Sequence, residues 1–310
     1  MSSVGAPRHD PIPMGQIAEP PFARIPDPTT LFQGRAERFA ALSDGHALAP
    51  YLRFLGALSR AQHRLQDGLA EPDMPAPDAR ERAREFGMPP LDRGRFTADA
   101  AFDATLDRLF ALAGEIKMPE QASAALARAT AADAVKGDSM VRAVLADAIP
   151  VDELADHLFV AAALQVHFAR QAARLDARRL VPVGDGACPA CGGPPVASLV
   201  VGWTGADNTR FCACSLCSTL WNFVRIRCTL CGSTAGIGYR QVEGGDGNVR
   251  DGNVRAEVCD SCHGYVKILQ QIQNPALDPV ADDVASLGLD LQVREQGYRR
   301  GAVNPFMLGY

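Results

Sequence analysis

Apolar residues recur every three to four positions through the first half of the chain. Leu31, Phe32 and Phe39 follow this spacing, and a leucine series over 48–65 continues it. This period is that of an amphipathic helix, so we predict an all-helical region over 27–177. Further helices within it, one with Thr97 as its N-cap, are predicted over 78–86, 97–113, 119–130, 135–148 and 152–175.

The pattern changes after a turn-rich boundary at 181–186. Short strand-like alternations follow, with one more helix predicted over 278–296 and an apolar end at 304–308 that docks on the fold or binds a partner. The near-duplicated segment 246–255 is rich in Gly, Asp and Asn, and we interpret it as a flexible hairpin tip.

These changes predict an α+β chain in four parts. Residues 1–25 hold five prolines and are expected to form a disordered tail. A helical domain over 26–182 is followed by two small rubredoxin-like or zinc-ribbon-like modules. The first module covers 183–222, and the second covers 223–310 with its helix and tail.

Composition excludes several classes of protein. With 310 residues and 47% hydrophobic content the chain has ample material for a core, and its net charge of −5 argues against a nucleic-acid partner. The best apolar run, 158–164, is far shorter than the roughly 18 residues of a membrane span, so no membrane insertion is expected. No secretory signal is present at the start, which predicts a cytoplasmic protein.

Cysteine spacing carries the clearest chemistry. Eight of the nine cysteines form four Cys-x-x-Cys pairs: Cys188 and Cys191, Cys214 and Cys217, Cys228 and Cys231, Cys259 and Cys262. Two such turns supply a tetrahedral shell of four sulfurs, so four turns supply two metal sites. Glycine follows two of the pairs, where a metal knuckle needs positive φ, whereas Ser218 and His263 follow the others and leave their geometry less certain.

Two other interpretations of the cysteines are weaker. Disulfides do not suit a chain of this size without a secretory signal. A thioredoxin-like redox pair needs one Cys-x-x-Cys between a strand and a helix, whereas this chain has four in ribbon-like surroundings. Metal binding is therefore the favoured interpretation.

Sequential pairing is the simplest arrangement of the ligands. Intervals of 22 residues after Cys191 and 27 after Cys231 are each long enough for a hairpin that joins two knuckles. One site would then comprise Cys188, Cys191, Cys214 and Cys217, and the other Cys228, Cys231, Cys259 and Cys262. An interleaved cross-brace is the open alternative. The ninth cysteine, Cys212, is interpreted as a half-buried strand residue, with a spare ligand or a reactive thiol as the alternatives.

The chain shows no Ser/His/Asp set, no phosphate loop and no paired catalytic carboxylates, so it is not expected to be an enzyme. Closed tetrathiolate sites are consistent with a structural metal, and iron would add a one-electron couple that zinc lacks. Three functions stay in view: a binding factor, a rubredoxin-like electron-transfer or thiol-redox protein, and a nucleic-acid-binding zinc ribbon.

The order of motifs from Cys188 to Phe306 resembles the formate dehydrogenase accessory protein family, FdhE. The motifs are Cys-Pro-x-Cys-Gly, Cys-x-x-Cys-x-x-x-Trp, Val-Arg-x-x-Cys-x-x-Cys, Cys-x-x-Cys-x-x-Tyr-x-Lys, the segment 281–287, and the stretch from Gly297-Tyr298 to Asn304-Pro305-Phe306. A looser match extends into residues 25–55.

This resemblance implies a cytoplasmic maturation factor that binds the catalytic subunit of respiratory formate dehydrogenase before export. It further implies iron at two sites per chain, with the eight paired cysteines as ligands. The client surface is expected to include the metal modules and three neighbouring aromatic residues, Trp221, Tyr239 and Tyr265, although packing against its own knuckle is the favoured interpretation of each.

Overall fold

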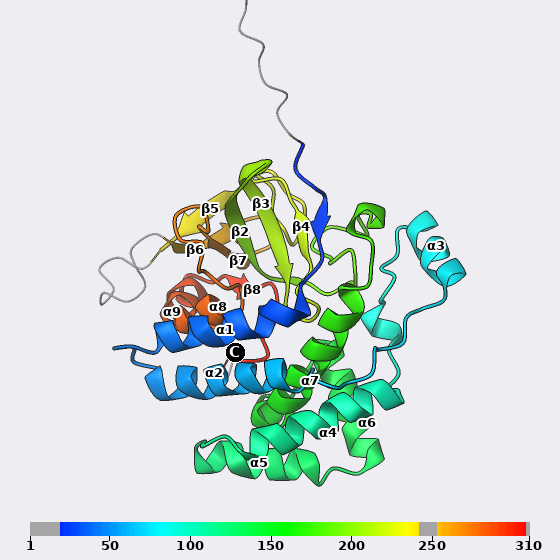
Figure 1. Ribbon diagram of the computed structural model, residues 1–310. Coiled ribbons are helices and arrows are strands. Elements are labelled where there is room, and N and C mark those ends of the chain that lie inside the picture. The colour runs from blue at the N-terminus through cyan, green and yellow to red at the C-terminus, as the bar shows by residue number, and fades with distance from the viewer. Residues whose placement is uncertain (1–18, 242–252, 308–310) are drawn as a thin grey trace, which may run out of the picture.

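The computed structural model describes residues 19–241 and 253–307 and confirms the α+β fold class. Helices fill the first part of the chain and a sheet the second (Figure 1). The helices before the sheet are α1 Pro28–Leu42, α2 Ala49–Arg64, α3 Pro77–Glu85, α4 Ala100–Gly114, α5 Glu120–Thr130, α6 Ala134–Leu145 and α7 Leu154–Ala172, with short 3-10 turns at Arg93–Arg95, Val151–Glu153 and Ala177–Arg179.

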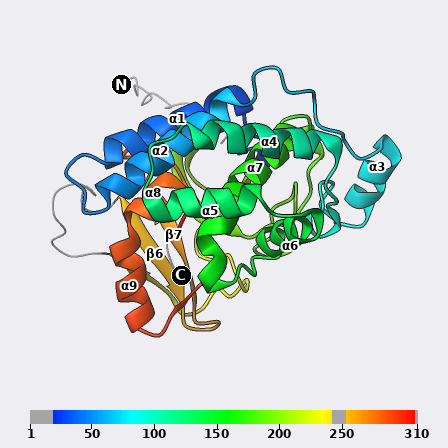
Figure 2. The same cartoon turned by 90° about the horizontal axis from the view of Figure 1, so that it is seen from below.

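Helix α7 forms the centre of the helical region. It packs against α1, α2, α4, α5 and α6 (Figure 2). Its residues 157–169 are all buried, including the polar Gln165 and His167, so the buried surface of this helix is not confined to one apolar stripe. Among the described residues, no helix combines the length and hydropathy needed to cross a membrane.

A single eight-stranded sheet carries both predicted modules. Its order is β1-β4-β3-β2-β7-β6-β5, with β8 also paired to β7. The strands are β1 Ala23–Arg24, β2 Pro195–Trp203, β3 Ala206–Cys214, β4 Leu220–Asn222, β5 Ile237–Arg240, β6 Val254–Cys259, β7 Gly264–Leu269 and β8 Arg299–Arg300. The parallel pairing of β2 with β7 joins the two halves, so the modules share one sheet.

A buried ion pair adds a second link between the halves. Arg210 on β3 pairs with Glu257 on β6 at 2.8 Å, and both side chains are buried. The Arg210 guanidinium also donates to the backbone carbonyls of Arg225 and Arg227 at 3.4 Å. It therefore holds the connection between the two halves against the sheet.

The predicted disordered tail over 1–25 extends too far toward the C-terminus. Ala23 and Arg24 form β1, which pairs with β4, because Ala23 is buried and the Arg24 guanidinium lies 4.1 Å from the centre of the Trp203 ring. Residues 1–18 lie outside the described residues.

The predicted N-cap of α4 is also wrong. Asp99, not Thr97, caps this helix by accepting the N–H of Phe102 at 2.7 Å.

The single helix predicted over 278–296 is two helices, α8 Ala281–Ala285 and α9 Leu287–Glu295. The break lies at Ser286. Buried Lys267 donates hydrogen bonds to the carbonyls of Asp283 and Ser286 at 2.7 and 3.1 Å, so these acceptors are withdrawn from a continuous helix. The sequence pattern alone does not show this tertiary contact.

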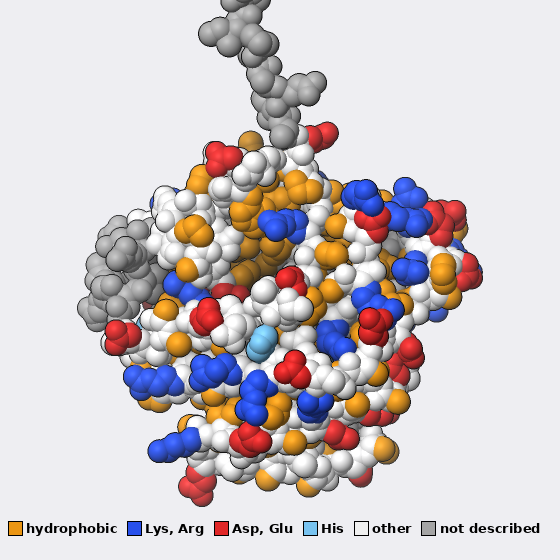
Figure 3. All heavy atoms as spheres, viewed as in Figure 1, with side chains coloured by type: hydrophobic (Ala, Val, Ile, Leu, Met, Phe, Trp, Pro, Cys, Tyr) orange, Lys and Arg blue, Asp and Glu red, His pale blue; other side chains and the backbone are white. Residues whose placement is uncertain are grey.

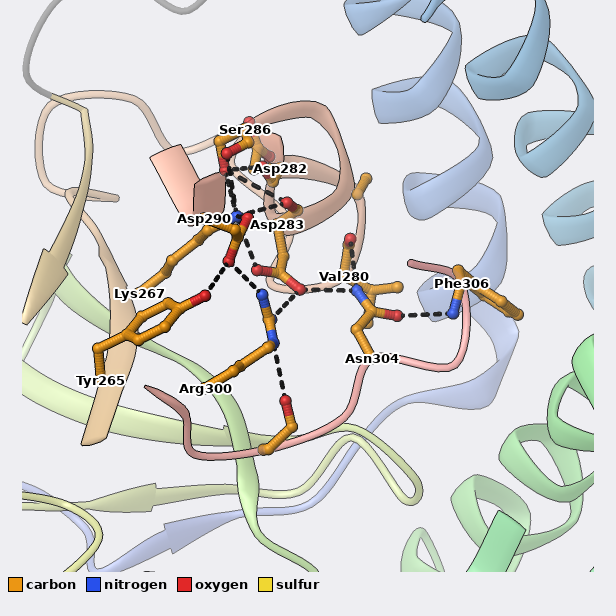
Figure 4. A network of polar contacts seen from close by, with 12 residues as sticks. Tyr265, Lys267, Val280, Asp282, Asp283, Ser286, Asp290, Arg300, Asn304 and Phe306 are labelled. Carbon is orange, nitrogen blue, oxygen red and sulfur yellow. Dashed lines mark hydrogen bonds and ion pairs between the residues drawn. The ribbon is translucent and has the colours of Figure 1, made fainter. Parts of the chain in front are cut away.

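Lys267 belongs to a buried ionic cluster that Figure 4 shows in full. The cluster consists of the cations Lys267 and Arg300 and the carboxylates Asp283 and Asp290, with each cation paired to both carboxylates. Tyr265 donates to Asp290 at 2.8 Å, and Asn304 donates to Asp283 at 2.8 Å. The two positive and two negative charges of the cluster balance. The cluster also joins four segments: strand β7, helices α8 and α9, and the C-terminal segment.

The apolar end of the chain docks on the fold. Phe306 is fully buried and Met307 nearly so, and the Tyr51 hydroxyl of α2 donates to the Phe306 carbonyl at 2.7 Å. Of the two alternatives for this end, docking is therefore the one that the structure shows. Leu308 and residues 242–252, which include most of the duplicated segment 246–255, lie outside the described residues.

His167 is a buried histidine in the helical core. Its ring lies among Phe96, Phe102 and Phe168, with centroids 5.4 to 6.0 Å away, and neither ring nitrogen has a hydrogen-bond partner among the described residues. Burial lowers the pKa of His167 to about 4. The imidazole is therefore neutral in the folded protein at neutral pH.

This environment predicts acid destabilisation. An unfolded histidine has a pKa of about 6.5, so below this value the unfolded state binds a proton that the folded state refuses until about pH 4. Between about pH 7 and pH 5 the stability of wild-type protein should fall by about 2 kcal/mol more than that of His167→Leu. Urea unfolding at both pH values measures this difference, and an equal acid loss in the two proteins would contradict it.

Candidate metal centres

Four sulfur atoms within 4.8 Å of one another form the first cluster, which consists of Cys188, Cys191, Cys214 and Cys217. The first pair lies on the turn before β2, and the second lies where β3 ends. The N–H of Gly192 donates to the Cys188 carbonyl at 2.8 Å, and the N–H of Cys188 donates to the Gly193 carbonyl at 2.8 Å. These bonds close a tight knuckle, and all four cysteines are buried.

The second cluster repeats this arrangement in the other half of the sheet with Cys228, Cys231, Cys259 and Cys262. The N–H of Gly232 donates to the Cys228 carbonyl at 3.0 Å, and that of Leu230 points at the Cys228 sulfur at 3.4 Å. Here Cys231 is exposed and Cys262 partly exposed. The structure thus groups the eight cysteines in the sequential way, not as an interleaved brace.

All four Cys-x-x-Cys turns end in the same backbone conformation. The following residue has a φ of 80° at Gly192, 56° at Ser218, 72° at Gly232 and 50° at His263. Ser218 and His263 therefore adopt the left-handed geometry that glycine takes most easily. The sequence leaves these two turns less certain because neither residue favours that conformation.

The sulfur spacing fits a tetrahedral ion. Metal–sulfur bonds of about 2.3 Å give sulfur–sulfur edges of roughly 3.8 Å. In the second cluster the Sγ atoms of Cys228 and Cys262 lie 3.8 Å apart, as do those of Cys231 and Cys259. In the first cluster the Sγ atoms of Cys188 and Cys217 lie 3.6 Å apart, and those of Cys191 and Cys214 lie 3.4 Å apart. All nine cysteines are free, so the disulfide alternative does not hold here.

The acidities of the thiols also suit a bound cation. Burial raises the pKa of Cys188 well above its usual value, whereas for Cys214 burial is outweighed by hydrogen bonds from the other three cysteines, which hold its pKa well below that value. In the second cluster burial raises the pKa of Cys228 to about 12, and for Cys259 burial is outweighed by backbone N–H groups, which lower its pKa to about 7. A bound cation would let every thiol ionise.

Cys212 belongs to neither cluster. It lies on β3, fully buried rather than half-buried, and burial raises its pKa to about 12. A thiol of this kind is unreactive. The strand interpretation of Cys212 therefore agrees with the structure, and the reactive-thiol alternative does not.

Helical residues that the sequence does not point to cover the first cluster. The Arg93 N–H donates to the Cys191 carbonyl at 3.1 Å, while its guanidinium pairs with Asp147 at 2.6 Å. Burial lowers the pKa of Arg93, but Asp147 and the nearby Cys191 and Cys214 outweigh it, so the pKa is raised. From α7, the Gln165 amide donates to the Ser215 carbonyl at 2.8 Å.

Two of the three aromatic residues proposed for a client surface are buried. Trp221 and Tyr265 are each 3% exposed, and the Tyr265 hydroxyl is committed to Asp290. Only Tyr239, at 46% exposed, is accessible among these three. The burial of Trp221 and Tyr265 therefore argues against contact with a client, and packing of each against its own knuckle stays a prediction.

The surface also carries an open groove beside α3. An open groove of about 700 Å³ lies between α3 and the body of the helical region, and its lining contains no serine, cysteine, histidine or lysine. On the face shown in Figure 3, Lys and Arg side chains are interspersed with Asp and Glu, without a continuous basic area. Neither feature indicates catalysis or nucleic-acid binding at these places.

The fold and the two clusters define a class of protein, in which a helical region is fused to one sheet that carries two tetrathiolate centres. Three family models match in succession: FdhE, N-terminal, over residues 20–185, the FdhE central domain over 187–225, and the FdhE C-terminal domain over 226–307. The chain belongs to the FdhE family.

Known relatives agree over nearly the whole length. A protein FdhE homolog of Rhizobium meliloti (strain 1021) is 47% identical over 308 residues, covering 99% of this chain and all of the relative. Protein FdhE of Escherichia coli (strain K12 / DH10B) is 33% identical over 284 residues, or 89% of this chain and 88% of that protein. The crystal structure of the FdhE protein from Pseudomonas aeruginosa has a TM-score of 0.81 at 32% identity and covers 93% of this chain and 99% of that one.

Proposed function

We propose that this protein is a cytoplasmic accessory factor that binds the catalytic subunit of formate dehydrogenase before its export. The observation that carries this proposal is the presence of both four-cysteine clusters in a chain that FdhE models match from residue 20 to residue 307. The helical region and the sheet offer broad surfaces of the kind that a binding factor needs. We expect no catalysis by the protein itself.

The first and second clusters are the proposed metal sites, with iron as the expected metal and zinc as the alternative. Four thiolates around one ion leave no open coordination position, so the residues hold the ion rather than expose it to a substrate. Iron would supply a one-electron couple when bound, and zinc would not. Anaerobic purification followed by metal analysis and a visible spectrum distinguishes them, because thiolate-bound ferric iron is coloured.

Deletion of the gene tests the function. Membrane formate dehydrogenase activity should fall in the deletion strain and return with the wild-type gene, but not with Cys228→Ser combined with Cys231→Ser. Cys212→Ala is the matched control, because Cys212 belongs to neither cluster, and it should restore activity. Capture of purified catalytic subunit by the tagged protein tests binding directly. Full activity without the gene, or no capture, would overturn the assignment.

Electron transfer is the second candidate function, and the exposure of Cys231 favours it because electrons enter a centre most readily at an accessible ligand. A carrier would undergo reversible reduction and reoxidation at a useful rate with a partner enzyme. A binding factor would capture the catalytic subunit in either oxidation state.

A further inference from the structure

The two clusters differ sharply in accessibility. In the first cluster no cysteine is more than 2% exposed. In the second, Cys228 and Cys259 are buried, but Cys231 is exposed and Cys262 partly so. The ligands and their spacing are alike, so this difference arises from what surrounds each cluster.

Segments of the helical region close the first cluster. Leu91 and Arg93 donate backbone N–H groups to the carbonyls of Ala190 and Cys191 at 2.8 and 3.1 Å, which fastens the stretch before α4 directly onto the first knuckle. The Gln165 side chain on α7 donates to the carbonyl of Ser215, which lies in the Cys214–Cys217 turn of the same cluster, and so fastens α7 onto that turn. An incoming ligand would have to break these contacts before it reached a sulfur.

The second cluster is bordered by short loops instead. The Arg227 guanidinium donates to the Gly232 carbonyl at 3.0 Å and to Asp185 at 3.0 Å, and the Tyr298 hydroxyl donates to Asp260 at 2.6 Å. These contacts fix the two knuckles from the side. They leave Cys231 accessible to solvent.

We infer that the two centres are kinetically unequal, with the second cluster exchanging its metal through Cys231 and the first cluster retaining its metal. This inference rests on the proposed metal sites. In the exchange step a thiolate or chelator donor binds the ion as the bond to the Cys231 sulfur breaks, and the freed thiolate takes a proton from water. No oxidation state changes. A soft thiolate ligand, small or carried on a protein, suits such a site.

Metal release from the zinc-loaded full-length protein tests the inference. With excess of the chromogenic chelator PAR, one zinc per chain should leave in a fast phase and the other at least about tenfold more slowly. Iodoacetamide added during the fast phase, followed by peptide mass spectrometry, identifies the cluster. Cys231 and Cys262 should be labelled, whereas the cysteines of the first cluster should stay protected.

Substitutions test whether the slow phase of zinc release depends on the segment that covers the first cluster. Arg93→Ala keeps the backbone N–H but removes the guanidinium that pairs with Asp147 at 2.6 Å and so holds this stretch over the first cluster. It should speed the slow phase and leave the fast phase unchanged. Arg95→Ala, an exposed arginine in the same 3-10 turn, is the matched control and should change neither. Cys228→Ser combined with Cys231→Ser should retain one slow zinc.

Equal rates for both zinc ions, or labelling of the first cluster as early as Cys231, would overturn the inference and leave the proposed function standing. Failure to capture the catalytic subunit would overturn that function and leave the kinetic difference measurable. A protein that binds no zinc and no iron would refute the proposed metal sites and, with them, this inference.

Discussion

Removal of both metals is expected to unfold the sheet region while the helices before it persist. The sheet has two small halves, and each is held at one end by a four-cysteine cluster that joins two knuckles. Structural zinc in small domains contributes about 10–16 kcal/mol of folding free energy, more than the whole stability of a typical domain. Helices α1, α2, α4 and α7 pack directly against one another, so we expect them to persist, although their apolar core continues into the sheet.

Hydrogen exchange read by mass spectrometry measures this effect segment by segment. After anaerobic chelation, peptides from β2, β3, β6 and β7 should lose protection, whereas peptides from α7 should keep most of theirs. Addition of metal back to the stripped protein is the control and should restore the original pattern. Unchanged exchange in the sheet after both ions are shown to be gone would mean that the clusters are not structural.

Lys267→Met is expected to lower the free energy of unfolding by about 3–5 kcal/mol, because it leaves two buried carboxylates opposite a single cation. Asp283 and Asp290 are at most 1% exposed, so water cannot replace the lost charge. Arg300 would remain as their only cationic partner within the ionic cluster. Urea unfolding of the metal-loaded protein gives the change.

Two further variants separate lost charge from lost packing. Lys136→Met removes an exposed lysine that pairs with Glu153 and should cost less than about 1 kcal/mol. Adding Asp290→Asn to Lys267→Met restores charge balance and should recover part of the loss. If Lys267→Met proved as mild as Lys136→Met, the ionic cluster would contribute little to stability.

Local patterns were enough to predict the helices before residue 180 and the four knuckles. The helical ranges follow from residues such as Phe32 and Phe39, whose spacing places them on one buried face whatever the tertiary context. The cysteine pairs are equally local, because two ligands three positions apart must share a turn. The family resemblance drew on the same short motifs and is confirmed.

Long-range contacts explain what the sequence could not predict. Lys267 and Arg210 belong to residue types that usually lie in solvent, yet both are fully buried because carboxylates far along the chain meet them. The parallel pairing of β2 with β7 and the cover that Arg93 provides are likewise set by distant segments. The unequal exposure of the two clusters therefore had no counterpart in their nearly identical motifs.

The pairing of β2 with β7 also dictates an order of events during synthesis. Ala197 of β2 pairs with Lys267 of β7, which is synthesised 70 residues later, so this pairing cannot form before then. Until then the β2–β3 hairpin presents an apolar edge with unpaired N–H and C=O groups, which is the kind of strand edge that recruits other chains into aggregates. The growing chain is thus most prone to aggregation after its first four cluster cysteines have emerged and before β7 has closed that edge.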